Sequence, residues 1–383
     1  MGRQSGEEAR RLTKPLAQAS LATGTAPQAR FYAPQLDGLR FIAAALVFVH
    51  HAPAIPLISG VKPYGWAGVD MFLAISAFLI TRLILLEHDR TGSFSLRSFY
   101  IRRALRIWPL YLSVATLLCL VSLVAHVVSA REAAAWWLSH VSFTNNILTA
   151  VKGYSPVPFS SHLWTISLEE QAYILMPLLL LAFIGSGARE RSAVAVCVAG
   201  LAALLLARLA LVLGGTAHPF IWVLPLRGDA FLLGGLGAIV THNRGPAMPA
   251  ALWIAGVLLI GSVPFFPPID RPGLYQVVGY TVLAAGCTAI VVASQYSDMA
   301  RRILGCPPLR YLGKISYGFY VYHLAALYAA EKLLGLVSDG SRPAVFAAGL
   351  LLTVGAASLS YAILERPFLL LKERFAFVPS RPA

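Results

Sequence analysis

Residues 36–55 read LDGLRFIAAALVFVHHAPAI, an apolar run with charges only at its start and two histidines near its end. A helix that spans a bilayer needs about 20 mainly apolar residues, so this stretch is long enough to cross a membrane. We therefore predict an all-α, polytopic membrane bundle of about ten transmembrane helices. The other segments of similar length and hydropathy are 66–85, 107–128, 163–184, 193–213, 220–240, 250–267, 275–294, 315–334 and 344–364.

The composition supports a membrane protein and argues against several other classes. Hydrophobic residues make up 57% of the 383 residues and charged residues 13%, which is about half of the roughly 25% charged residues typical of soluble domains. The net charge is +14, but the basic residues lie between apolar runs rather than along one face, so nucleic-acid binding is not indicated. The sequence has no glycine-rich phosphate loop after a strand-like segment, which argues against a nucleotide-driven pump.

Cysteine usage gives no sign of a redox or metal site. The four cysteines show neither paired spacing nor the spacing of metal ligands, and three of them lie inside apolar runs: Cys119, Cys197, Cys287 and Cys306. We therefore expect no disulfide framework and no metal.

The distribution of basic residues predicts the orientation of the chain. With the N-terminus in the cytoplasm, 22 of the 31 lysines and arginines fall on the cytoplasmic side and six on the opposite side. Because cytoplasmic loops carry an excess of Lys and Arg, we predict that both termini are cytoplasmic. The stretch between the third and fourth spans contains Trp136 and Trp137 and predicts an interfacial loop with a short helix.

The same pattern predicts three parts of the chain. Residues 1–35 are a disordered basic cytoplasmic tail, because they are polar and lack the apolar core and cleavage site of a secretory signal. Residues 36–370 form the transmembrane domain. Residues 371–383 form a second cytoplasmic tail.

Ionisable residues in the first span indicate a functional site, because charges at membrane depth are costly and mark a site by default. At 100° per residue, Arg40 and His51 lie within about 20° of one helix face and about 16 Å apart along the axis. They share a face but cannot touch. Two structural readings stay open: Asp37 and Arg40 are spaced for a local ion pair, and a histidine near a helix end is often interfacial.

Further ionisable residues lie in the second span and in the segment after it. Asp70 falls at the expected depth of His51. Arg102, Arg103 and Arg106 form the most basic segment, and Arg103 and Arg106 share a helix face. Arginine offers a planar set of donors that suits phosphate. This segment is therefore either an anion site or a charge cluster that only fixes the topology.

The fourth, sixth and ninth spans carry the remaining candidates. Glu169 and Glu170 are adjacent carboxylates inside the fourth span, and we expect one of them to be neutralised or paired with Arg227 of the sixth span. The ninth span carries Tyr320 and His323. An aromatic and hydroxyl stripe inside a bundle is more often a helix-packing feature, and we favour that interpretation for His323.

In this order, the motifs resemble the acyltransferase-3 family of integral-membrane acyltransferases, which modify sugars and related acceptors. The resemblance covers about residues 34–370. Each motif is weak alone, but six in order on ten spans are specific, and the family spacing selects His51 rather than His50 as the counterpart of its essential histidine. The motifs are LDGLR at 36–40 with a histidine eleven residues after its arginine, GVDxF at 68–72, RIxP at 106–109, WxxSxEEQxY at 164–173, ISYxxYxxH at 315–323 and ERP at 365–367.

The resemblance implies a membrane-bound acyl-CoA-dependent O-acyltransferase of a bacterial cell membrane. Such an enzyme moves an acyl group, usually acetyl, from cytoplasmic acyl-CoA to a hydroxyl of a carbohydrate acceptor, either a cell-surface polysaccharide or a glycolipid. No metal is implied. The residues leave open whether the acyl group is acetyl or somewhat longer, and which acceptor is used.

The resemblance and the layout together give each candidate residue an expected role. His51 is the general base or a transient acyl carrier, and Asp70 or Glu169 orients its imidazole. Arg227 and Trp164 are the expected acceptor-binding residues. The phosphates of CoA meet four arginines, Arg40, Arg102, Arg103 and Arg106.

Three alternatives stay open. The acceptor is a small secondary metabolite such as a macrolide, as for some family members. The chain is a proton-coupled transporter in which His51, Asp70, Glu169 and Arg227 form a relay, although the two halves show none of the similarity that inverted repeats give. The chain is a silent scaffold, which has no need of six charge-bearing motifs.

Two departures from the family pattern are visible. Family members usually have glycine after the serine of the second span, where this chain has Ala77 after Ser76. We expect the added methyl group to tighten the helix contact and to leave Ser76 available. Some relatives carry an appended extracellular hydrolase-like domain, and we expect none here because the sequence ends within about 20 residues of the last span.

Overall fold

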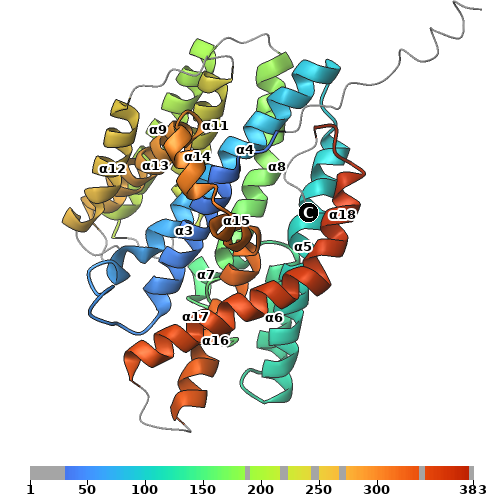
Figure 1. The fold of residues 1–383 in the computed structure, drawn as a ribbon, viewed down its shortest axis with the longest axis vertical. Coiled ribbons are helices and arrows are strands. Elements are labelled where there is room, and N and C mark those ends of the chain that lie inside the picture. Colours follow the sequence, from blue (N-terminus) through green and yellow to red (C-terminus); the bar gives the residue numbers. More distant parts are fainter. Residues whose placement is uncertain are drawn as a thin grey trace, which may run out of the picture.

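The computed structural model describes residues 31–185, 190–215, 223–242, 250–266, 273–335 and 341–378. Within these ranges the regular structure is helical, as predicted for an all-α bundle (Figure 1). The helices are α3 (Pro34–His51), α4 (Gly68–Thr91), α5 (Leu96–Val124), α6 (Ala130–Val141), α7 (Asn145–Lys152), α8 (Trp164–Gly185), α9 (Glu190–Leu213), α11 (Asp229–Thr241), α12 (Ala251–Gly261), α13 (Leu274–Gln295), α14 (Asp298–Leu304), α15 (Pro307–Lys314), α16 (Ser316–Gly335), α17 (Arg342–Ser360) and α18 (Arg366–Glu373).

Six helical segments of the described residues are long and apolar enough to cross a membrane. The chain is therefore a multi-pass membrane protein. The other four predicted spans overlap with helices α3, α11, α12 and α16, of which α11 and α12 are shorter than predicted within the described residues, so that Arg227 lies in a short turn before α11. The number of ten spans and the cytoplasmic position of both ends stay predictions. The six segments are Lys62–Thr91, Leu96–Val124, Trp164–Gly185, Glu190–Leu213, Leu274–Gln295 and Arg342–Glu373.

Helix boundaries differ from the predicted ones around the basic segment. The third span was expected from residue 107, but α5 begins at Leu96, where the Ser95 hydroxyl accepts a hydrogen bond from the backbone nitrogen of Ser98 at 3.2 Å. Such an N-cap satisfies one of the free amides at a helix start. The basic segment is consequently part of α5 itself, so its arginines have fixed directions.

The predicted interfacial loop contains two helices, α6 and α7. Ser129 and Glu132 form a reciprocal capping box at the start of α6, which fixes that end of the helix. Trp136 is 3% exposed and packs in a small cluster with Cys119 of α5 and Val157. Residues 1–30 of the predicted first tail and residues 379–383 of the second lie outside the described residues.

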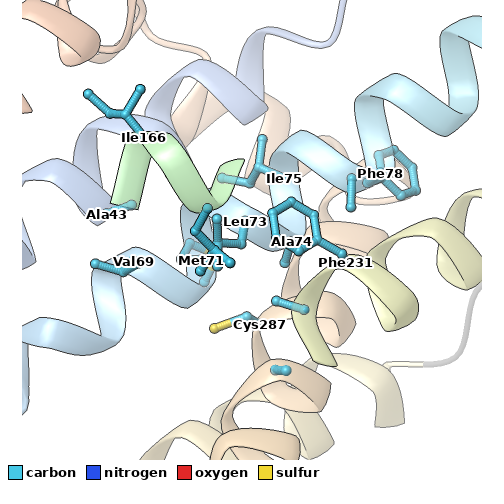
Figure 2. Packing of buried hydrophobic residues seen from close by; sticks show 14 of the residues in the cluster. Ala43, Val69, Met71, Leu73, Ala74, Ile75, Phe78, Ile166, Phe231 and Cys287 are labelled. Carbon is cyan, nitrogen blue, oxygen red and sulfur yellow. The ribbon is translucent and has the colours of Figure 1, made fainter. Parts of the chain in front are cut away.

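Helix α4 lies at the centre of the largest hydrophobic core. Ile75 and Ile80 of this helix are fully buried. Figure 2 shows residues of α4 packed close to Phe231 of α11 and Cys287 of α13. Because α4 is covered on several sides, polar residues on it are held inside the protein rather than against lipid. This burial explains why Asp70 needs a partner.

Several close helix contacts depend on glycine, and two of them fix α3. A Cβ atom on Gly68, at the start of α4, would lie 2.2 Å from the carbonyl oxygen of Ala43 in α3. A Cβ atom on Gly313, in α15, would lie 2.0 Å from the carbonyl oxygen of Asp37 in α3. Both distances are far below van der Waals contact, so any larger residue forces the backbones apart. These contacts hold α3, with its ionisable residues, against the core.

The alanine that departs from the family pattern is accommodated by a glycine opposite it. A Cβ atom on Gly234 of α11 would lie 3.0 Å from the Cβ of Ala77 and 2.7 Å from the carbonyl oxygen of Ala74. Helices α4 and α11 therefore pack tightly at this point. The hydroxyl of Ser76, next to Ala77, donates a hydrogen bond to Glu169 at 2.7 Å.

A second hydrophobic cluster brings α16 and α17 against the outer part of α3. The ring of Phe48 in α3 lies 5.7 Å from that of Phe319 in α16 and 5.4 Å from that of Phe346 in α17. Figure 1 shows α17 crossing the bundle at a steep angle close to α16. This packing sets the neighbours of the two histidines that end α3.

Candidate active site

Three cavities follow one another through the bundle. We call them the arginine cavity, of about 270 Å³, the central cavity, of about 70 Å³, and the histidine cavity, of about 390 Å³. The arginine and central cavities share three lining residues, Arg40, Arg103 and Arg106. The central and histidine cavities share another three, Val69, Thr165 and Tyr320. We call these last three residues the neck.

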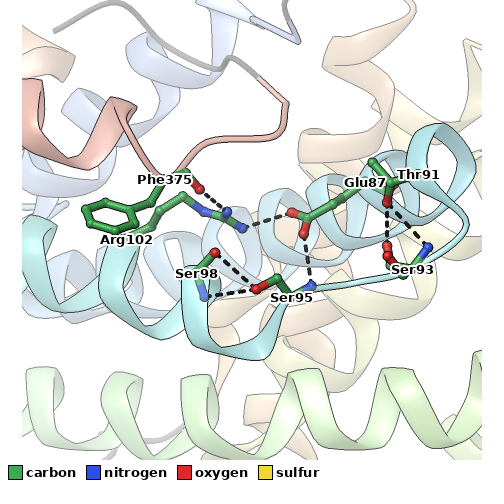
Figure 3. A network of polar contacts seen from close by, with 7 residues as sticks. All are labelled: Glu87, Thr91, Ser93, Ser95, Ser98, Arg102 and Phe375. Atoms are coloured by element: carbon green, nitrogen blue, oxygen red, sulfur yellow. Dashed lines mark hydrogen bonds and ion pairs between the residues drawn. The ribbon is translucent and has the colours of Figure 1, made fainter.

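Arg102 is held by the protein itself. One guanidinium nitrogen donates to Glu87 at 3.0 Å and another donates to the carbonyl oxygen of Phe375 at 2.6 Å, as Figure 3 shows. Glu87 also accepts a hydrogen bond from the backbone nitrogen of Ser95 at 3.1 Å. Arg102 thus joins α4, α5 and the segment after α18 at the edge of the arginine cavity.

The other three predicted arginines line the wall between two cavities. Arg40 lies 3.8 Å from Asp37, which is the local ion pair anticipated from their spacing. The guanidinium of Arg103 stacks over the rings of Phe99 and Tyr173, at 5.5 and 5.2 Å. Within the described residues, Arg106 has no ion pair or hydrogen-bond partner among the side chains. Its charge is therefore available to an anion in either cavity.

Glu169 lines the central cavity and accepts two hydroxyl hydrogen bonds. Ser76 of α4 donates to one carboxylate oxygen at 2.7 Å, and Tyr173 of α8 donates to the same oxygen. Glu170 points elsewhere and accepts a hydrogen bond from the indole nitrogen of Trp108 at 3.2 Å. The two adjacent carboxylates thus have different surroundings, and only Glu169 faces the central cavity.

Asp70 and Arg227 form a buried ion pair. Arg227 donates from Nε to one oxygen of Asp70 at 2.9 Å and from a terminal nitrogen to the other oxygen. Both side chains are 1% exposed or less, and the guanidinium also lies over the rings of Trp66 and Tyr280. Of the two expectations for Glu169 and Glu170, neutralisation or pairing with Arg227, the pairing is wrong, because Arg227 pairs with Asp70 instead.

The histidine cavity is lined by His51 and by residues of the loop before α8. His51 ends α3, and its Nδ1 lies 2.9 Å from the carbonyl oxygen of Val47 and 3.2 Å from Nε2 of His323 in α16. His162 packs against His323, with 4.7 Å between the ring centres. Trp164 is 4% exposed and contributes to the cavity wall.

Lys62 closes the end of α3 beside this cavity. Its ammonium donates to the carbonyl oxygens of His50 and Ala52 at 2.8 and 2.6 Å. The last carbonyls of a helix lack partners within it, and a cation satisfies them well. The Nδ1 of His50 hydrogen-bonds the carbonyl oxygen of Lys62 at 3.0 Å. Both histidines line the histidine cavity, with 5.0 Å between their ring centres, but they have different hydrogen-bond partners.

Sequence reasoning did not find several members of this arrangement. It did not single out His162, in the loop before α8, and it treated His323 of α16 as a packing residue rather than as a neighbour of His51. A second buried ion pair joins Arg208 and Asp229 at 2.6 and 3.0 Å. These partners lie far apart in the sequence or on different helices, so periodicity gave no signal for them. The only available hint was that each is an ionisable residue at membrane depth.

Residues 34–362 match the family model of acyltransferase-3, described as an acyltransferase domain. The chain belongs to the acyltransferase-3 family. It is 25% identical over 366 residues to the peptidoglycan O-acetyltransferase OatA of Listeria monocytogenes, covering 90% of this chain and 57% of the relative. It is also 25% identical over 374 residues to the O-acetyltransferase OatA of Staphylococcus aureus strain NCTC 8325, covering 91% of this chain and 59% of the relative.

The chain thus spans less than two thirds of the length of these acyltransferase-3 relatives. The alignments with these relatives include the membrane-spanning region of this chain. No solved structure matches the chain. The family membership agrees with the resemblance found in the motifs.

Proposed function

We propose that the protein is an O-acyltransferase that moves an acetyl group from acetyl-CoA to a hydroxyl of a carbohydrate, with donor and acceptor entering from opposite ends of the bundle. The observation that carries this proposal is the series of three cavities, with cationic side chains at one end and His51 at the other. Family membership and relatives named O-acetyltransferases support the same reaction class.

The arginine cavity suits the nucleotide end of CoA. Phosphates bind well to arginine through charge-assisted hydrogen bonds. Arg106 has its charge available, and Arg40 and Arg103 line the same wall. Arg102 plays a different part, because its donors already bind Glu87 and Phe375. We assign Arg102 to shaping the cavity entrance and the other three arginines to the phosphates.

The central cavity suits the narrow arm that carries the thioester. Arg40 and His51 are eleven residues apart on one helix, which is about 16 Å along its axis. An extended pantetheine arm covers a distance of this order. With the phosphates at Arg106, the thioester would then reach the neck between the central and histidine cavities. Glu169, Ser76 and Tyr173 would contact this arm rather than the acceptor.

We assign His51 to the activation of the acceptor. In the proposed reaction its Nε2 takes the proton of the acceptor hydroxyl, the hydroxyl oxygen attacks the thioester carbonyl, and the thiolate of CoA leaves and is protonated. A route through a transient acyl-histidine gives the same products in two steps. A carbohydrate fits the aromatic wall formed by Trp66, Trp164 and Tyr154, because sugar C–H faces pack on aromatic rings while hydroxyls reach the polar groups.

Removing the available cation is expected to weaken donor binding. The substitution Arg106→Ala should raise the KM for acetyl-CoA about 10-fold with little change in kcat, because a hydrogen bond to a charged group contributes about 1.5–3 kcal/mol and each 1.4 kcal/mol is tenfold. Steady-state kinetics of the purified protein in nanodiscs measure both constants. Arg97→Ala is the matched control, because Arg97 is an exposed arginine near the start of the same helix. Equal KM values for the two variants would contradict a phosphate-binding role.

The proposed function is tested with radiolabelled acetyl-CoA and a panel of acceptors. We expect purified protein in nanodiscs to transfer label to a cell-wall glycan or a glycolipid and to release free CoA. Label on a macrolide instead would assign the alternative acceptor class. Solute uptake into proteoliposomes without acyl-CoA, together with no acetyl transfer, would identify a transporter. Acyl chains of two to six carbons offered in competition would define donor selectivity.

A further inference from the structure

A general base of the histidine type works best when another group holds its ring in one orientation and one tautomer. The carboxylates first considered for this task are engaged elsewhere. Both oxygens of Asp70 bind Arg227. One oxygen of Glu169 binds Ser76 and Tyr173 in the central cavity. The side chain that contacts the imidazole of His51 is instead His323.

The protonation of the two rings follows from their backbone partners. A carbonyl oxygen only accepts hydrogen bonds, so a ring nitrogen bonded to one must carry a proton. Nδ1 of His323 lies 2.6 Å from the carbonyl oxygen of Tyr320, and Nδ1 of His51 lies 2.9 Å from that of Val47. Both Nδ1 atoms are therefore protonated. In a neutral imidazole the other nitrogen, Nε2, then carries only a lone pair.

The contact between the rings fits this assignment. Nε2 of His323 lies 3.2 Å from Nδ1 of His51, so the lone pair of His323 accepts from the same N–H that bonds Val47. The acceptor role requires His323 to be neutral. The remaining nitrogen of His51, Nε2, has no hydrogen-bond partner within the described residues, and His51 is exposed to the histidine cavity.

We infer that His323 is the positioning residue of His51: its Nε2 accepts the Nδ1–H of His51, aims the basic nitrogen into the cavity and stabilises the imidazolium formed during transfer. His323 touches neither donor nor acceptor. It has the role that a carboxylate has where it orients a histidine that acts as a general base. This inference rests on the proposed function, because it assigns a task within the same acetyl transfer.

The surroundings keep this pair fixed. His323 is 1% exposed, and its ring packs on His162. The further ionisable groups near the pair are His50 and Lys62, both tied to backbone carbonyls at the end of α3. A carboxylate bonded to the pair is absent from the described residues. A neutral acceptor therefore provides the orientation without placing a permanent negative charge beside the base.

Two substitutions of closely similar size separate an acceptor role from a packing role. In His323→Gln, the amide oxygen reaches the place of Nε2 and can accept from His51. In His323→Asn, the shorter amide reaches only the place of Nδ1, so it can bond Tyr320 but not His51. Both replace an imidazole by an amide, and both leave a similar gap beside His162.

We expect His323→Asn to lower kcat for acetyl transfer about 10- to 100-fold and to leave the KM for acetyl-CoA unchanged. The expected loss in kcat corresponds to the loss of one hydrogen bond to a charged group. We expect His323→Gln to retain kcat within about threefold of the unmodified protein. Equal losses in both variants, or no loss in either, would overturn the inference. Thermal unfolding in detergent checks that both variants are folded. If one of them is unfolded under the assay conditions, both are assayed in nanodiscs at a lower temperature.

The same assay keeps the two claims apart. If the unmodified protein transfers acetyl groups and His323→Asn matches it, the inference fails and the proposed function stands. If the unmodified protein transfers no acetyl group to any acceptor of the panel, the proposed function fails and the inference fails with it.

Discussion

Replacing His51 with alanine is expected to lower acetyl transfer about 100- to 10,000-fold, which is the range that a positioned general base contributes. The KM for acetyl-CoA should change less than about twofold, because the arginines proposed to bind its phosphates lie at the other end of the cavities. Turnover of labelled acetyl-CoA by purified protein in nanodiscs measures both constants.

The neighbouring histidine offers a matched comparison. His50→Ala removes an imidazole at the adjacent position, but this ring bonds the carbonyl oxygen of Lys62 and not His323. We expect this variant to keep at least about a tenth of the activity. The loss would come from the missing hydrogen bond to Lys62, which helps to hold the end of α3. Similar activities of the two variants would exclude His51 as the general base. They would also exclude the proposed transfer from a donor in the arginine cavity to an acceptor in the histidine cavity.

Breaking the buried ion pair between α4 and the turn before α11 is expected to give the largest loss of stability. Asp70→Ala leaves the guanidinium of Arg227 buried without its carboxylate, and removal of one partner of such a pair costs about 3–5 kcal/mol. Arg227→Met leaves the carboxylate buried instead and should cost a similar amount. The midpoint of thermal unfolding in detergent is the measurement, read by fluorescence of the buried tryptophans.

The double variant Asp70→Leu with Arg227→Met separates a role of the two residues in stability from a role in catalysis. Because both charges are removed together, we expect it to recover most of the lost free energy of unfolding. Activity in this variant then reports directly on the catalytic role considered for Asp70. A stable double variant with full acetyl transfer would limit Asp70 and Arg227 to holding α4 against the following helices. Single variants as stable as the unmodified protein would contradict the buried pair itself.

Much of the helical architecture was predictable because hydropathy and helix length are local properties. The segments that carry LDGLR, GVDxF and WxxSxEEQxY each form a helix close to the expected range. The start of α5 was missed because hydropathy marks only the apolar part of a helix. Its polar first turns depend on a serine cap that a hydropathy window does not register.

Charge pairing was much less predictable. The local pair of Asp37 and Arg40 follows from spacing along one helix. The partner of Arg227 lies 157 residues away in the sequence, and several carboxylates at membrane depth were equally reasonable from the sequence. Only the packing of α4 on α11 and α13 decides between them. Pairing at membrane depth is therefore a property of the assembled bundle.

The environment of His51 shows the same limit. Spacing and the family resemblance selected this residue as the base, and the structure places it beside a cavity. The neighbour that bonds its ring, His323, had been interpreted as a packing residue because a stripe of aromatic and hydroxyl groups usually has that role. Its contact with His51 arises from the phenylalanine packing of α3 on α16, which no single helix encodes.

The neck between the central and histidine cavities also bears on whether protons can leak across the membrane through the protein. A continuous wet path through a bilayer protein would let protons leak down their gradient. In the neck, the hydroxyls of Thr165 and Tyr320 bond each other at 2.6 Å and both reach the carbonyl oxygen of His162. The two hydroxyl protons are thus shared among these three contacts, beside the apolar side chain of Val69. In the proposed reaction the arm of the donor has to separate these two hydroxyls, and we expect the neck to stay closed to water when no donor is bound.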